Sequence, residues 1–170
     1  YALAYIGRSG FEDYKSEFEK ALNDSSYLVV SATIAQYTRN NELLPASILA
    51  RYEKDPDLNV VITLADYYSR KKEEKSYQWF QNRMNGLDGN TLFFFIQAYA
   101  EKLLSAPLAY RKSAVPQLEE VARNNSNYLA RFSAFQALIL LSDLDGVDAK
   151  ILDIKKNEKD PRLTELYEDI

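Results

Sequence analysis

The phrase Glu-Lys-Asp-Pro-x-Leu is written twice in the chain, at residues 53–58 and 158–163. In each copy an aspartate, Asp55 or Asp160, stands three residues before the leucine and directly before a proline. An Asp side chain accepts hydrogen bonds from the free N–H groups at a helix start, and proline at the first helical position loses no bond. The phrase therefore predicts two helix starts, with Asp55 and Asp160 as N-caps.

The same arrangement recurs in looser form before Tyr27, Leu92 and Tyr128, with Asp24, Gly89 and Asn125 as the anchors. In chain order the five anchors lie 31, 34, 36 and 35 residues apart. Intervals of this length are typical of helical solenoid repeats. The spacing predicts an all-α fold, a right-handed α-solenoid of about five antiparallel helix pairs, in which residues 1–170 form a single repeat domain.

Apolar residues between the anchors follow the three-and-four spacing of amphipathic helices. The second helix of each pair is predicted to start after its anchor, with stripes such as Tyr27, Val30, Ile34 and Tyr37, or Leu58, Val61, Ile62, Ala65 and Tyr68, or Tyr128, Phe132, Phe135, Leu138 and Ile139. The first helices carry narrower stripes and are predicted to be more exposed. Residues 92–104 are apolar on nearly all sides, which predicts the least exposed helix, and residues 162–170 leave room for a short closing helix.

Two prolines, Pro45 and Pro116, precede their anchors by ten and nine residues. Each is predicted to start or to kink the first helix of its pair. For the second proline, Ser113 is a candidate N-cap of a helix with Pro116 in its first turn, and a kink is the alternative.

Charge and composition limit the partners. Lys and Arg total 21 against 25 for Asp and Glu, which gives a net charge of −4. This acidic balance disfavours nucleic acid, whose phosphates need clustered cations. No apolar run approaches the ~18 residues of a membrane span, so we expect a soluble protein, cytoplasmic or periplasmic. Because the chain starts at Tyr1 without Met, we also expect a piece of a longer protein.

The residue types that most active sites use are missing, since the chain has neither His nor Cys. This excludes the commonest general base and the nitrogen and sulfur ligands of zinc. The acidic stretch 143–148 lacks the residue that closes a calcium loop and is predicted to be a turn. The sequence therefore predicts no catalytic, cofactor-binding or metal-binding residue, and no enzyme activity for this chain alone.

Adjacent aromatic residues point to a contact surface. Tyr67 beside Tyr68, and Trp79 beside Phe80, lie about 100° apart on their helices, so one member of each pair is predicted to be accessible. Tyr, Trp and Arg are favoured anchors of protein interfaces. The candidate partner-contact residues are Tyr67, Arg70, Trp79 and Arg83, and an ordinary solvated surface is the alternative.

The alternation of a helix with an early proline, a turn with Asp or Asn, and a second helix of small and apolar residues resembles HEAT and armadillo repeats across nearly the whole chain. More narrowly, residues 18–29, 128–138 and 158–163 resemble the HEAT-like C-terminal region of bacterial M1-family zinc aminopeptidases. In that family a catalytic domain carries a zinc-binding His-Glu-x-x-His helix and a Gly-rich exopeptidase motif. The helical region packs beside it and helps to enclose the substrate cavity.

Neither of those two motifs is present in this sequence, so no catalytic or zinc-binding residue is carried over. The resemblance implies a noncatalytic accessory domain of a larger peptidase, with the zinc in another domain and the catalytic domain of the same polypeptide as partner. The alternative is a HEAT-type scaffold or adaptor module that binds another protein. A His-Glu-x-x-His motif upstream in the same polypeptide distinguishes the two.

Overall fold

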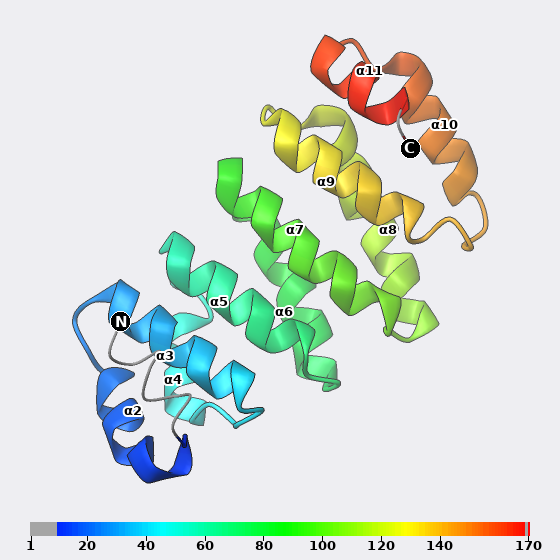
Figure 1. Cartoon of the computed structure of the whole chain (residues 1–170). Helices are drawn as coiled ribbons and strands as arrows, with labels where there is room; N and C mark the ends of the chain where they lie inside the picture. The colour runs from blue at the N-terminus through cyan, green and yellow to red at the C-terminus, as the bar shows by residue number, and fades with distance from the viewer. Residues whose placement is uncertain (1–9, 169) are drawn as a thin grey trace. The chain divides into compact units, whose positions relative to one another are not determined.

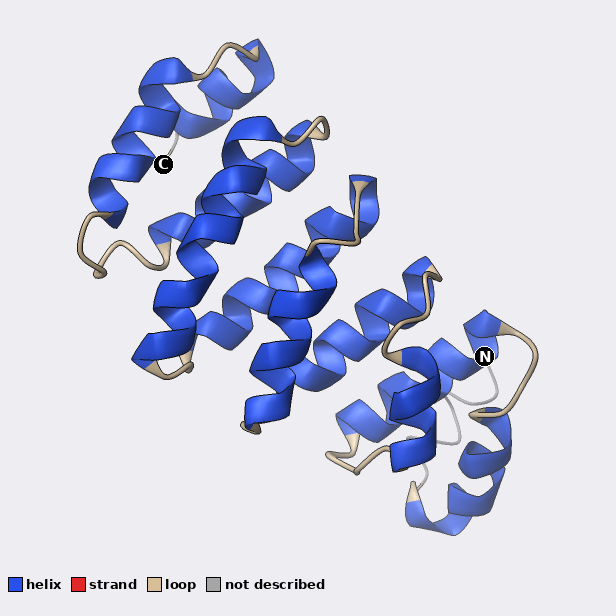
Figure 2. Cartoon of the chain, turned by 180° about the vertical axis from the view of Figure 1, so that it is seen from behind, coloured by secondary structure: helices blue, strands red, loops and turns tan. Residues whose placement is uncertain are grey.

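The computed structural model describes residues 10–168 and residue 170, and over these residues the chain is helical, with ten α-helices, one short 3₁₀ helix and no strand (Figures 1 and 2). The predicted all-α class is therefore confirmed. The chain divides into two compact units, residues 1–72 and residues 73–170.

The first unit contains the 3₁₀ helix η1 (Glu12–Tyr14) and the helices α2 (Lys15–Ala21), α3 (Tyr27–Arg39), α4 (Ala46–Tyr52) and α5 (Leu58–Ser69). Its main contact joins α3 and α5, the second helices of the first two predicted pairs. Most of each predicted stripe is buried, and Val30, Ile34 and Val61 are at most 1% exposed. The first residues of the two stripes are not, since Tyr27 and Leu58 are 44% and 39% exposed. Phe18 of α2 adds to this core by stacking on Phe11, with ring centres 4.9 Å apart.

The second unit contains α6 (Glu74–Met84), α7 (Gly89–Leu104), α8 (Leu108–Asn124), α9 (Tyr128–Ile139), α10 (Val147–Asn157) and the short closing helix α11 (Pro161–Glu168). Here α7 and α9 lie side by side, with α8 behind them (Figure 1). The helix α9 contacts α7, α8, α10 and α11. It can do so because Ala130, Ala134 and Ala137, all at most 1% exposed, let neighbouring helices approach its backbone closely.

The second helices of the predicted pairs begin close to the predicted positions, but four of the five anchors are not N-caps: Asp24, Asp55, Gly89 and Asn125. Asp55 accepts a hydrogen bond from the backbone N–H of Asp57 at 2.9 Å, which closes an Asx turn, and Asp57 is the N-cap of α5. Asn125 and Asn127 repeat this arrangement before α9, also at 2.9 Å. Asp and Asn are used both for Asx turns and for N-caps. The sequence pattern therefore located the Asx turn and placed the N-cap two residues too early.

The true caps hold the first turn of their helices. Asp57 Oδ1 accepts from the N–H groups of Asn59 and Val60 at 2.9 and 3.2 Å. Asp160, by contrast, is a cap as predicted, because its Oδ1 accepts from the N–H of Arg162 at 3.1 Å. The two copies of the phrase are therefore used in different registers: Pro161 is the first residue of α11, whereas Pro56 lies before the N-cap of α5 and not at its first position.

The two interior prolines behave differently from each other. Pro45 occupies the N-cap position of α4 and so starts that helix, as predicted. Pro116 lies in the interior of α8, which begins at Leu108, so Ser113 is not a cap and donates instead to the carbonyl of Tyr110 at 3.0 Å. Because Pro116 and Lys112 are both exposed, water can bond the Lys112 carbonyl that the proline leaves without a donor.

The helix α7 is not the least exposed helix, contrary to the prediction. Its residues Phe94 and Leu104 are 44% and 62% exposed, and Gln97 is exposed as well. In its unit α7 is covered by α6 and α9, which leaves one side of an apolar helix uncovered. That uncovered side becomes part of the candidate site.

Replacing the cap Asn127 by Ala is expected to destabilise the protein by ~0.5–2 kcal/mol. The N–H groups of Leu129 and Ala130, which now donate to Asn127 at 2.9 and 3.1 Å, would lose their acceptor. The free energy of unfolding, measured in urea, tests this. Asp88→Ala is the matched control, because Asp88 is the N-cap of α7 but its side chain makes no cap hydrogen bond; equal losses in the two variants would contradict the assignment.

Candidate functional site

The predicted accessibility of the aromatic pairs is wrong. Tyr67 and Tyr68 are 3% and 2% exposed, and Trp79 and Phe80 are 8% and 0% exposed, so neither member of either pair is a surface residue. Tyr67 and Arg70 both lie on or next to α5 in the first unit, whereas Trp79 and Arg83 lie on α6 in the second. Partner contact by these four residues therefore stays a prediction, and burial counts against the two rings.

The adjacent tyrosines are both buried because the first unit covers α5 on two sides. The Tyr67 hydroxyl accepts a hydrogen bond from the backbone N–H of Leu44 at 3.2 Å, just before α4. The Tyr68 hydroxyl donates to Glu53, at the C-terminal end of α4. The 100° rotation between neighbouring helix positions thus points the two rings to different parts of one core, and not one ring to solvent.

The same reasoning applies to Trp79 and Phe80. Trp79 packs against Phe95 of α7 with ring centres 5.4 Å apart, and Phe80 stacks on Tyr99 at 5.0 Å. The side of α6 that carries Trp79 therefore also faces α7. The two arginines differ: Arg70 is exposed and paired with Asp66 at 3.0 Å, while Arg83 is half-buried.

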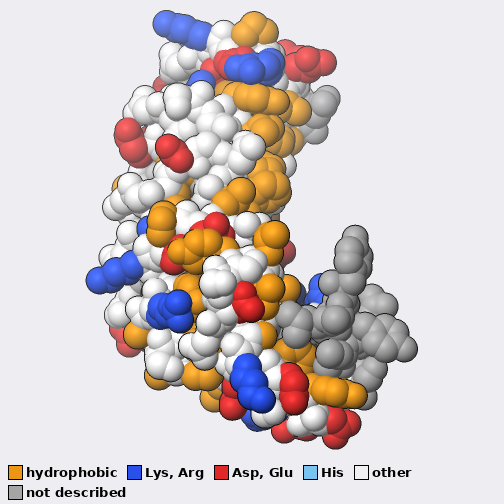
Figure 3. Space-filling model, turned by 90° about the vertical axis from the view of Figure 1, so that its left-hand side faces the viewer, with side chains coloured by type: hydrophobic (Ala, Val, Ile, Leu, Met, Phe, Trp, Pro, Cys, Tyr) orange, Lys and Arg blue, Asp and Glu red, His pale blue; other side chains and the backbone are white. Residues whose placement is uncertain are grey.

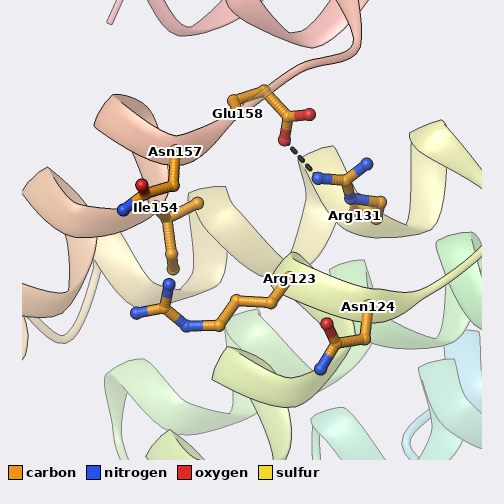
Figure 4. Close-up of a pocket in the computed structure, with 6 residues that line it drawn as sticks. All are labelled: Arg123, Asn124, Arg131, Ile154, Asn157 and Glu158. Atoms are coloured by element: carbon orange, nitrogen blue, oxygen red, sulfur yellow. Dashed lines mark hydrogen bonds and ion pairs between the residues drawn. The ribbon is translucent and has the colours of Figure 1, made fainter.

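A polar pocket of about 230 Å³ lies where α8, α9 and α10 meet (Figure 4). Figure 4 shows Arg131 pointing towards Glu158, and the long side chain of Arg123 reaching across towards α10. Arg131 forms an ion pair with Glu158 and donates from Nε to the carbonyl of Ala122 at 3.0 Å. The Glu158 side chain is only 2% exposed.

The charges around this pocket are compensated within the protein. Arg123 pairs with Glu119 at 2.9 Å and with Asp153 at 2.8 Å. Burial by itself raises the pKa of Glu119, but hydrogen bonds from Lys150 and Arg123 outweigh it and lower the pKa. The remaining oxygen of Glu158 accepts from the N–H groups of Lys159 and Asp160, both at 2.8 Å. Since each arginine already has carboxylate partners, the pocket is a junction between helices and not an anion site.

Neither member of the ion pair at this junction was singled out from the sequence. The Glu of the repeated phrase was visible, and in both copies it ends a helix: Glu53 is the C-cap of α4 and Glu158 that of α10. The repeated phrase does not predict which residue pairs with this Glu, because the two copies have different partners. Tyr68 donates a hydrogen bond to Glu53, whereas Arg131 donates one to Glu158.

A second cavity, of about 380 Å³, lies between α7 and α9 and is mainly apolar. Its floor consists of the small, buried residues Ala100, Ser133 and Ala137. The other residues that line it are Gln97, Gln136, Ile139, Leu140 and Ile170. No charged side chain lines this cavity.

The surface around this cavity is named the α7–α9 face: Phe94, Gln97, Glu101 and Leu104 of α7, Phe132, Gln136 and Ile139 of α9, Leu140 and Ile170. Figure 3 shows hydrophobic side chains gathered along one edge of the upper part of the molecule. On α7 and α9 the charged residues are Glu101, Lys102 and Arg131, whereas α8 alone carries Arg111, Lys112, Glu119, Glu120 and Arg123. Lys102 is buried and Arg131 is paired with Glu158, so Glu101 is the exposed charge of these two helices.

Lys102 is a buried cation, 1% exposed, with no hydrogen-bond partner for its amine among the described residues. Its Nζ lies 4.0 Å from the centre of the Tyr77 ring, a cation–π contact. Tyr77 in turn stacks on Tyr110, whose hydroxyl donates to Glu74 at 2.9 Å. Burial lowers the pKa of Lys102 to about 8, against an opposing effect of the Glu73 carboxylate.

Residues 143–146 of the acidic stretch form a turn, as predicted, and residues 147 and 148 already belong to α10. Asp143 accepts from Arg111 of α8 at 2.9 Å, and Gly146 takes the left-handed conformation with φ of 76° at the N-cap of α10. Across residues 10–168 and 170, no three His, Cys, Asp or Glu side chains gather in a way that would hold a metal ion. None of the described helices is long and apolar enough to cross a membrane.

No family model matches the chain, and no match is found among curated proteins or among solved structures. The resemblance to HEAT repeats and to the M1 aminopeptidase C-terminal region therefore remains a prediction from the residues that carry it.

Replacing Arg131 by Ala is expected to lower the free energy of unfolding by about 3 kcal/mol or more, because the buried Glu158 carboxylate loses its counter-charge. Urea denaturation measures the loss. Arg70→Ala is the control, since the Arg70 and Asp66 side chains are 59% and 44% exposed, and it should cost less than ~1 kcal/mol. Similar losses in both variants would show that the junction adds no special stability.

The buried amine of Lys102 makes stability depend on pH. Its ordinary pKa is 10.5 and its pKa in the folded protein is about 8, so between these values the unfolded chain binds more protons. The free energy of unfolding should therefore rise as the pH is raised from about 8, and be flat with respect to this group below that pH.

Lys102→Met removes the titrating group, so it should abolish this rise and increase stability at pH 7. Guanidinium denaturation at several pH values between about 7 and 9.5 tests this, before the raised pKa values of Tyr99 and Tyr167, both about 12, become relevant. Lys112→Met, at an exposed position of α8, is the control and should leave the pH profile unchanged.

Proposed function

We propose that this chain is a noncatalytic helical-repeat module that acts by binding a protein, and that the α7–α9 face is the binding surface. One observation carries the proposal: Phe94 and Leu104 of α7 are 44% and 62% exposed, Leu140 at the C-cap of α9 is 44% exposed, and the two helices have little exposed charge. Contiguous apolar surface on a protein marks an interaction site, and depletion of charge is typical of the centre of an interface.

The repeat architecture proposed for the module is a right-handed α-solenoid of about five helix pairs. Its support is the packing within each unit, where the second helices of neighbouring predicted repeats contact each other: α3 with α5, and α7 with α9. In such a stack the second helices line one side, which gives a module of this kind a long surface for a partner.

The narrower form of the proposal is an accessory domain of an M1-type zinc aminopeptidase, which packs beside the catalytic domain and helps to enclose the substrate cavity. Its support is the resemblance carried by residues 18–29, 128–138 and 158–163. In this form the partner is the catalytic domain of the same polypeptide, and the zinc belongs to that domain. A scaffold that binds another protein is the alternative, and the exposed α7–α9 face supports either form.

A photo-crosslinking amino acid at position 136 should capture the partner, whereas the same amino acid at position 152 should not. Gln136 lies on the α7–α9 face and lines the cavity between α7 and α9, which is called the groove from here on. Leu152 is an exposed apolar residue of α10 that does not line this groove. The experiment is made in cells that express the intact polypeptide, and mass spectrometry identifies the captured peptide. Capture at position 136 should be lost in the Leu140→Lys variant.

Equal capture at the two positions would overturn the proposed surface. The captured sequence also separates the two forms of the proposal, because the M1-type form requires a crosslink to a domain with a His-Glu-x-x-His motif. Zinc-dependent hydrolysis of an aminoacyl substrate by the purified chain would contradict a noncatalytic role.

A further inference from the structure

We propose that the partner segment bound by the α7–α9 face is an amphipathic helix, whose apolar stripe enters the groove and whose Lys or Arg pairs with Glu101. This inference rests on the proposed function and adds the chemistry of the partner to it. Three features of the second unit carry it: the shape of the groove, the hydrogen-bonding capacity of its lining, and the position of its charge.

The shape of the groove suits a helix with large apolar side chains. The buried floor of Ala100, Ser133 and Ala137 leaves a cavity of about 380 Å³, bordered by Ile139 and Leu140. A cavity of this size lies within the range of protein binding pockets. A channel between two neighbouring helices is the surface into which the side-chain ridge of a third helix packs.

The lining offers few hydrogen bonds, which favours a helix over an extended segment. Its polar side chains are Gln97, Ser133 and Gln136, and the Ser133 hydroxyl already donates to the carbonyl of Phe93 at 3.3 Å. An extended segment would bring backbone N–H and C=O groups that need partners in this apolar groove. A helix satisfies those groups internally and presents only side chains.

The charge of the face selects a cation on the partner. Glu101 lies one helical turn after Gln97, is exposed, and has no ion pair among the described residues. The nearest candidates on the same two helices are not available to it, since Lys102 is buried against Tyr77 and Arg131 is paired with Glu158. An apolar stripe flanked by Lys or Arg is therefore complementary, whereas an acidic flank or an anionic lipid surface is repelled.

The test uses the full chain and two synthetic helical peptides of about 18 residues, long enough to form isolated helix. Both carry the same leucine stripe, one with lysine flanks and the other with glutamate flanks. Fluorescence anisotropy at low salt should show tighter binding of the lysine-flanked peptide by about two- to fivefold, the effect of one exposed ion pair. In the Glu101→Lys variant this preference should reverse.

Binding of both peptides should weaken by at least about fivefold in Leu140→Lys, because a charge then lies at the edge of the apolar groove. Leu152→Lys is the matched control, since Leu152 is 67% exposed on α10 and should not affect binding. Both positions are on the surface, so the variants should fold, and circular dichroism confirms this before binding is measured.

The outcomes separate this inference from the proposed function. If the two peptides bind equally and Glu101→Lys changes nothing, the basic-flanked occupant is wrong, although an apolar binding face remains. If neither peptide binds while crosslinking at position 136 persists, the helical occupant is wrong and the proposed function stands. If Leu140→Lys affects neither peptide binding nor crosslinking, both proposals are wrong. Self-association that Leu140→Lys abolishes, or binding to anionic vesicles, would replace the helix by a second copy or by a membrane surface.

Discussion

In the second unit, four helices meet on α9, and the way in which that helix is packed constrains everything around it. Alanines at positions 130, 134 and 137 allow close approach, and Phe135 and Leu138, both fully buried, supply the apolar volume between the helices. Because protein interiors are in general packed as densely as organic crystals, buried contacts of this kind leave α7 and α8 little freedom in how they lie against α9. The cavity between α7 and α9 is a consequence of small residues at positions 100, 133 and 137.

Polar contacts at the helix ends join helices to one another in addition to the apolar packing. The buried pair of Arg131 and Glu158 joins α9 to the turn before α11, and the carbonyl of Ala122 adds the end of α8 to the same guanidinium. Lys102 has no such partner for its amine among residues 10–168 and 170, and the ring of Tyr77 compensates only part of the cost of burying it. One buried cation is thus satisfied and structural, while the other opposes folding at neutral pH.

The distribution of charge supports the binding role that is proposed for this chain. The surface of α8 and α10 carries several ion pairs, such as those of Arg123 with Glu119 and with Asp153. The α7–α9 face has apolar and amide side chains with Glu101 as its exposed charge, so the unit presents two chemically different sides. A partner that covers the second side gains apolar burial at the cost of little desolvation of charge.

The sequence by itself determined the all-α class, the approximate starts of the second helices and most of the apolar positions that form the cores, because these follow from spacing along one chain segment. It located Asp160 as a cap but placed the caps of α5 and α9 two residues early, since Asx turns and caps use the same residue types. Only the tertiary structure decided which side of a helix is covered: Tyr67 and Trp79 are buried because second elements reach them, and Phe94 is exposed because none in its unit does. The groove depended on the tertiary structure as well, because residues 97–100, 133–140 and 170 meet only when α7, α9 and the end of the chain are packed together.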